Sequence, residues 1–116
     1  MVKLDKAQRL DYLKEMISEA PDEPFGYYAL CLENETENQI ENSGNWIELL
    51  EKFPGYLPSY YMAGEAFLKL GQKEKAILTW RQGLEIAIKQ GNHHTSTELK
   101  SAIQNALIDD DDDDEL

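Results

Sequence analysis

Amphipathic segments alternate along this chain with short polar segments that contain proline or glycine. Residues 4–19 contain a series of apolar residues spaced three or four positions apart, namely Leu4, Ala7, Leu10, Leu13 and Ile17. This spacing predicts a helix with one apolar face. Similar patterns predict five further helices, over about 23–34, from about 43–45 to 53, over 58–70, over about 73–90 and from about 95 to 108. No segment has the alternation of a strand, so we expect an all-α fold.

Turn-forming residues separate these segments. Pro54 and Gly55 end the third predicted helix, and Gly71 stands where a left-handed residue is wanted after the fourth. The segment 34–45 is polar, which predicts a late and short third helix beginning near 43–45. Residues 95–98, Thr-Ser-Thr-Glu, match a capping box that opens the sixth helix or lies just inside it.

A second pattern is superposed on the first, because several residues recur 34 positions later. The recurring pairs are Pro24 and Pro58, Tyr27 and Tyr61, Ala29 and Ala63, Trp46 and Trp80, and Leu50 and Leu84. A fixed period near 34 is typical of stacked helical hairpins. Such hairpins bury their apolar faces against one another and together form a concave surface.

Residues 57–90 carry the most specific form of this repeat. The first helix has Tyr60, then the small pair Ala63-Gly64, then Phe67, and the second helix has Ala76 and Trp80. Small residues let two helices approach, and the aromatic residues fill the space beside them. In these features the segment resembles a tetratricopeptide repeat.

Residues 23–56 resemble a degenerate copy of the same repeat. Leu30 stands in the glycine slot and Asn42 in the alanine slot of the second helix, so we expect an irregular hairpin. Residues 4–21 resemble a lone second helix, and residues 96–108 resemble a capping helix. The resemblance implies antiparallel helical hairpins stacked as a short right-handed superhelix.

Charge is uneven over the 116 residues. The formal net charge is −12, but seven of the 23 acidic side chains lie in 109–115, which leaves 16 against 11 basic ones. The acidic run repels itself, so we expect a helical domain over 1–108 and a disordered acidic tail over 109–116. Nucleic acid and anionic membrane surfaces both need a basic patch, which excludes them as expected partners.

Few residues point to chemistry. Cys31 is the only cysteine, so no disulfide can form within the chain, and a reducing, cytoplasmic setting is expected. Neither a secretory signal nor an apolar run of membrane-spanning length is present. His93 and His94 are adjacent, point apart on a helix and have no third ligand at metal-site spacing. No catalytic motif appears, so we expect no enzyme activity, no cofactor and no metal.

The resemblance implies that the first helix of each hairpin lines the concave groove. The groove residues expected on this basis are Tyr27, Cys31, Tyr61, Glu65, Leu68 and Lys69. The alternatives are that the tyrosines are half-buried packing residues, and that Glu65 and Lys69 form only a solvated stripe. The leading expectation for function is a protein–protein interaction module, an adaptor or scaffold that binds a peptide or a partner helix. The alternative is a structural protein that forms a homodimer through its groove or end helices.

Overall fold

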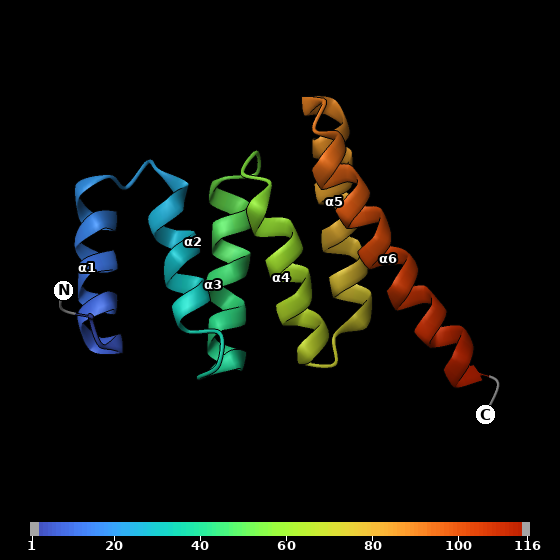
Figure 1. The fold of residues 1–116 in the computed structure, drawn as a ribbon, viewed down its shortest axis with the longest axis horizontal. Helices are drawn as coiled ribbons and strands as arrows, with labels where there is room; N and C mark the ends of the chain where they lie inside the picture. Colours follow the sequence, from blue (N-terminus) through green and yellow to red (C-terminus); the bar gives the residue numbers. More distant parts are fainter. Residues whose placement is uncertain (1–2, 115–116) are drawn as a thin grey trace. The chain divides into compact units, whose positions relative to one another are not determined.

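The computed structural model describes residues 3–114, and their side chains as far as residue 108. Within the described residues every regular element is a helix (Figure 1). The helices are α1 (Lys6–Glu19), α2 (Pro24–Glu33), α3 (Gln39–Lys52), α4 (Pro58–Lys69), α5 (Lys73–Gln90) and α6 (His93–Asp114). Within each of the two compact units of the chain, successive helices run antiparallel, as α1 and α2 do at the blue end of Figure 1. The predicted all-α fold of helical hairpins is confirmed.

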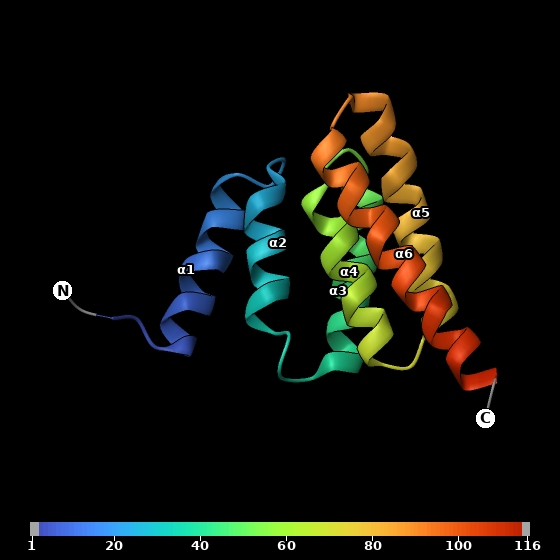
Figure 2. The same ribbon diagram turned by 45° about the vertical axis from the view of Figure 1, so that its right-hand side comes forward.

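The chain divides into two compact units, Met1–Pro54 and Gly55–Leu116. Their boundary falls at the Pro54-Gly55 turn that the sequence places after the third helix. In the first unit α2 packs against both α1 and α3, and in the second unit α5 packs against both α4 and α6. Figure 2 shows α5 and α6 lying side by side in the second unit. Each unit therefore has a central helix with a neighbour on either side.

Local hydrogen bonds begin and end several of these helices. Asp5 and Gln8 form a capping box at the start of α1, in which the side chain of each accepts from the other's backbone N–H. Gly71 has the predicted left-handed backbone, with φ of 78°. At the start of α6 the backbone N–H of Thr95 donates to Oδ1 of Asn92 at 3.0 Å. The capping-box pattern at 95–98 thus lies just inside the helix, the second of the two alternatives.

The prediction of a late and short third helix is wrong. α3 has 14 residues and begins at Gln39, directly after Asn38, whose φ is 49°. Asn42 is buried, and its Nδ2 donates to the backbone oxygen of Cys31 on α2 at 2.9 Å. A carbonyl near the end of a helix needs such a partner when it is buried. This hydrogen bond between helices supports the first turn of α3, and no local sequence pattern contains it.

In the second unit, Gly64 lets the indole of Trp80 pack directly on the backbone of α4. A Cβ at Gly64 would overlap Nε1 of Trp80, and that nitrogen donates to the backbone oxygen of Tyr61 at 3.2 Å. Trp80 is 1 % exposed. One turn further along α5, a Cβ at Gly83 would lie 2.5 Å from Cβ of Tyr60. Two glycines, one on each helix, therefore set how closely α4 and α5 approach.

The first unit packs the equivalent tryptophan differently. Leu30 occupies the place that Gly64 has in the second unit, which leaves no room for an indole on the backbone of α2. Trp46 is fully buried and meets the ring of Tyr28 edge-on, with centroids 5.9 Å apart. Among the described residues, Nε1 of Trp46 has no hydrogen-bond partner. The degenerate repeat thus keeps a tryptophan in its core, but this tryptophan forms no hydrogen bond to the neighbouring helix as Trp80 does.

The last helix reaches into the acidic segment. The backbone of α6 is helical as far as Asp114. The predicted disordered tail, residues 109–116, lies outside the residues whose side chains are described. The division into a helical domain over 1–108 and an acidic tail therefore stays a prediction.

We expect Gly64→Ala to destabilise the chain strongly, because the added Cβ must push Trp80 away from α4 and break its hydrogen bond to Tyr61. Overpacking of this kind costs about 1–3 kcal/mol or more, which lowers Tm by about 5–15 °C. Gly44→Ala is the matched control. Gly44 lies within α3 with no atom near its Cβ site, so alanine there should raise stability by about 0.5–1 kcal/mol. Equal melting curves for the two variants would contradict this packing.

Candidate functional site

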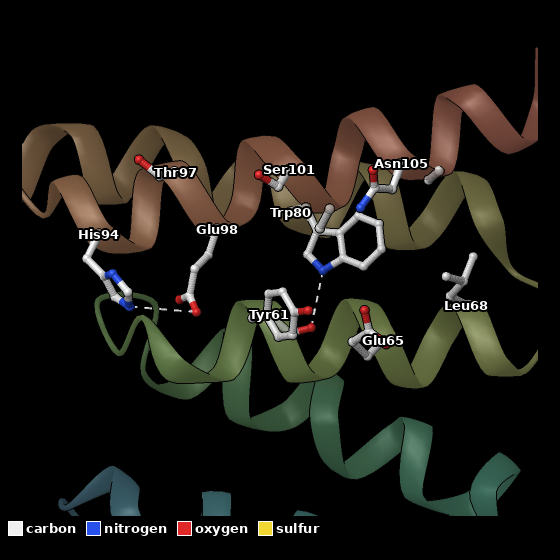
Figure 3. A pocket seen from close by; sticks show the side chains of 11 residues that line it. Tyr61, Glu65, Leu68, Trp80, His94, Thr97, Glu98, Ser101 and Asn105 are labelled. Atoms are coloured by element: carbon white, nitrogen blue, oxygen red, sulfur yellow. Dashed lines mark hydrogen bonds and ion pairs between the residues drawn. The ribbon is translucent and has the colours of Figure 1, made fainter.

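A groove runs between α4 and α6 in the second unit (Figure 3). Its volume is about 370 Å³. One wall is the side chains of Tyr61, Glu65 and Leu68 on α4, and Trp80 of α5 lies between the walls. The other wall comes from α6, through His94, Thr97, Glu98, Ser101, Ala102, Asn105 and Ala106. We call this site the α4–α6 groove.

The floor of the α4–α6 groove is the core contact described above. Trp80 lies next to Tyr61 between α4 and α6 and is held there by its hydrogen bond to the Tyr61 backbone oxygen. Ala102 and Ala106 face the groove from α6, and their short side chains leave it open. A groove with a rigid aromatic floor is largely formed before any ligand arrives, which lowers the cost of binding.

The groove is acidic. Glu65 lies on one side of Tyr61 and Glu98 on the other (Figure 3). Burial raises the pKa of the Tyr61 phenol, and the negative charges of Glu65 and Glu98 raise it further. The nearest imidazole, that of His94, has its Nε2 3.8 Å from Oε2 of Glu98. No lysine or arginine is among the described residues that line the groove.

The six predicted groove residues fall into three places. Tyr61, Glu65 and Leu68 line the α4–α6 groove together. Tyr27 and Cys31 line a different pocket, of about 290 Å³, within the first unit. Lys69 is exposed at the end of α4 and does not line either pocket.

The α6 wall was missed by the sequence reasoning, which treated this helix only as a cap. A signal was present, because His94, Glu98, Ser101 and Asn105 follow one another at spacings of three and four. They therefore form a polar stripe on one side of α6. The apolar stripe of Leu99, Ile103 and Ala106 is buried. A polar stripe on a helix whose apolar stripe is buried is the pattern that would have revealed the second wall.

Tyr27 has the contacts expected of a packing residue. Its hydroxyl donates to the backbone oxygen of Pro21 at 3.1 Å and accepts from Nζ of Lys52 at 3.0 Å. The ring centroid lies 5.5 Å from that of Phe53, and the Lys52 ammonium lies 4.7 Å from the Tyr27 ring. Both its hydroxyl and its ring are therefore engaged inside the first unit.

Cys31 is buried beside Tyr27, with 2 % of its surface exposed. Burial raises the pKa of its thiol to about 12, and the nearby carboxylate of Glu48 adds to the rise. A thiol in this state is neutral and unreactive near neutral pH.

A third and larger pocket, of about 700 Å³, lies between α1 and α2. Its surface includes three exposed apolar side chains, those of Leu4, Tyr12 and Phe25. Two ion pairs border it: Nε of Arg9 lies 2.6 Å from Oε1 of Glu33, and Lys6 pairs with Glu37 at 3.2 Å. We call this surface the α1–α2 face.

The described residues also bear on two other kinds of site, a metal centre and a membrane-spanning helix. No group of three or more histidine, cysteine, aspartate or glutamate side chains among them could hold a metal ion. None of the helices in the described part of the chain combines the length and apolar character needed to cross a membrane.

Comparison with known proteins identifies the repeat. No family model matches the chain, and no curated protein matches it. A solution structure of a tetratricopeptide repeat domain protein from Salinibacter ruber is 33 % identical, with a TM-score of 0.69, over 74 % of this chain and 88 % of that one. A crystal structure of a tetratricopeptide repeat domain protein from the same organism is also 33 % identical, with a TM-score of 0.66, over 72 % of this chain and 94 % of the other.

The chain belongs to the tetratricopeptide repeat family. The resemblance seen in residues 57–90 is thereby confirmed. Of the two tetratricopeptide hairpins, α4–α5 keeps the small residues that allow close packing. The α2–α3 hairpin keeps Ala29 but has Leu30 and Asn42 in place of the other two. The α4–α6 groove is built on the regular hairpin.

We expect Cys31 to resist thiol reagents in the folded protein. At pH 8 a thiol of pKa about 12 is roughly one part in 10⁴ thiolate, against about a tenth at the ordinary value of 9.0. A colorimetric disulfide reagent should therefore react about a thousandfold more slowly than in guanidinium-unfolded chain. Because the folded pKa is raised, the contribution of Cys31 to stability is complete below pH 9.0 and is lost as the pH rises towards about 12. Equal rates in folded and unfolded protein would show that the thiol is accessible.

Proposed function

We propose that the chain is a protein–protein interaction module, an adaptor or scaffold that binds an extended peptide or a partner helix in the α4–α6 groove. The observation that carries this proposal is the groove itself. It places an aromatic side chain and an apolar one, Tyr61 and Leu68, opposite a polar stripe on α6. Aromatic anchors with adaptable polar neighbours are typical of protein-binding surfaces.

The character of the groove fits a peptide better than a small metabolite. It is open along its length between two helices, and its polar residues Thr97, Ser101 and Asn105 lie along one wall rather than converging on a point. A peptide offers regularly spaced side chains and a backbone that hydroxyl and amide groups can bond. We assign no catalytic activity and no cofactor to the groove. The net charge of −12 argues against nucleic acid as a partner. We also propose that the protein acts in the cytoplasm.

To test this function, we would select peptides from a random linear library on the full chain and map them on Ser101→Tyr. Ser101 is exposed in the groove, so a tyrosine there should obstruct it and reduce affinity at least tenfold. Gln104→Tyr is the matched control. Gln104 is exposed on α6 and does not line the groove, so this variant should bind as the parent does.

Two results would contradict the proposal. One is a library that yields no binder at micromolar concentration. The other is a set of binders whose affinity falls equally in the two tyrosine variants, because binding would then lie outside the groove. Circular dichroism of both variants confirms that each remains helical.

Self-association is a second candidate, and the α1–α2 face favours it. Tyr12 on α1 is 58 % exposed and Phe25 on α2 is 56 % exposed. Together with Leu4 they line the same pocket between these two helices. Clustered exposed apolar side chains on a soluble protein often mark an interface. A second copy of this chain would cover that surface.

We expect Phe25→Asp to abolish any concentration-dependent dimer, because a carboxylate buried at an interface costs several kcal/mol. Ile40→Asp serves as the control, since Ile40 is 81 % exposed and does not line the α1–α2 face. Sedimentation velocity from about 5 to 200 μM gives the oligomeric state. A parent chain that stays monomeric throughout this range rejects self-association through the α1–α2 face.

A further inference from the structure

The charges of the α4–α6 groove indicate what kind of peptide it takes. The described residues that line the groove include two carboxylates, those of Glu65 and Glu98, but no lysine and no arginine. The carboxylates come from opposite walls, and Tyr61 lies between them (Figure 3). Burial raises the pKa of the Tyr61 hydroxyl, and both carboxylates raise it further, which agrees with their places on either side of the ring.

We infer that the groove selects a basic peptide, with a lysine or arginine side chain seated against the Tyr61 ring between Glu65 and Glu98. This inference rests on the proposed function and specifies the partner's chemistry. A cation at this place would meet a carboxylate on each side and an aromatic face beneath it, and both kinds of contact attract it.

The shape of the groove suits the rest of such a side chain. Leu68 and the floor over Trp80 offer apolar surface, along which the methylene stem of lysine or arginine can lie while its charged end stays near water. Ser101 and Asn105 stand on the opposite wall. Their hydroxyl and amide groups can bond the peptide backbone.

The existing neighbour of Glu98 does not prevent this. His94 lies 3.8 Å from the carboxylate, and the two side chains are 87 % and 49 % exposed. A long, solvated contact of this kind contributes little to stability and exchanges easily. An incoming cation held between two carboxylates would replace it.

The same charges disfavour acidic occupants. An acidic peptide would bring like charges next to Glu65 and Glu98, which costs free energy at this range. The acidic run at 109–115 of the chain's own sequence is such a segment. The groove therefore discriminates against the chain's own acidic run as well as against acidic partners.

The two tryptophans provide a direct test. The chain has two, Trp46 and Trp80, and only Trp80 lines the groove. Its indole ¹⁵N–¹H resonance reports groove occupancy, and that of Trp46 reports effects elsewhere. We would titrate the full chain with three ten-residue peptides, in which alanine alternates with lysine, glutamine or glutamate.

We expect the lysine peptide to shift the Trp80 resonance with the highest affinity and the glutamate peptide to leave it unmoved. Glu65→Gln and Glu98→Gln should each weaken the lysine peptide by about two- to fivefold, and the double variant by about tenfold. Glu74→Gln is the control, because Glu74 is exposed on α5 outside the groove. Raising the salt from about 0.05 to 0.5 M should weaken parent binding and reduce the difference between parent and double variant.

The outcomes separate this inference from the proposed function. If the glutamine peptide binds as well as the lysine peptide and Ser101→Tyr blocks both, the groove binds peptides but does not select basic ones, and the inference fails alone. If all three peptides leave Trp80 unmoved and the library also yields no groove binder, the proposed function fails as well. If Glu74→Gln weakens the lysine peptide as much as the groove variants do, its binding reflects net charge and the inference is wrong.

Discussion

The indole of Trp80 rests on the backbone of α4 at Gly64, and this contact connects the core of the second unit to its groove. The tryptophan is buried, yet its ring nitrogen donates to the backbone oxygen of Tyr61, the residue whose side chain stands in the groove. Any change in the distance between α4 and α5 therefore moves Tyr61. Because protein interiors are close-packed, the surrounding side chains cannot move to compensate for such a shift. The geometry of the α4–α6 groove therefore depends on Gly64 in the core.

The first unit shows what the repeat becomes without that glycine. Leu30 stands at the position of that glycine, and Nε1 of Trp46 has no hydrogen bond in the described structure. A hydrogen bond from Asn42 to the backbone oxygen of Cys31 joins the two helices instead. A buried amide is costly unless it is bonded, so Asn42 admits few alternative arrangements of α2 and α3. The α2–α3 hairpin has a directional hydrogen bond in place of close packing, and two of the residues that line its pocket, Tyr27 and Lys52, are hydrogen-bonded to one another.

Local chemistry explains how much of this fold could be predicted from the sequence. The α4–α5 hairpin could be predicted because its key residues act within one helix or between neighbouring helices, so their spacing in the sequence is sufficient. These residues are Gly71, Trp80 and the small pair Ala63-Gly64. The start of α3 could not be predicted because it depends on Asn42 meeting a carbonyl eleven residues earlier. Tyr61, Glu65 and Leu68 of α4, which line one wall of the groove, were among the residues that the sequence singled out. The other wall lies on α6, where no aromatic or small-residue motif drew attention to the polar stripe.

The order of helix packing has a kinetic consequence. Within each unit the packed pairs are consecutive helices, α1 with α2, α2 with α3, α4 with α5 and α5 with α6. Contacts between segments close in the sequence close small loops, which cost little entropy. Chains built in this way have low contact order and reach the native state within microseconds to milliseconds. Folding of the first unit can thus begin while the ribosome is still adding the residues of the second, since a polypeptide grows by only about 5–20 residues per second.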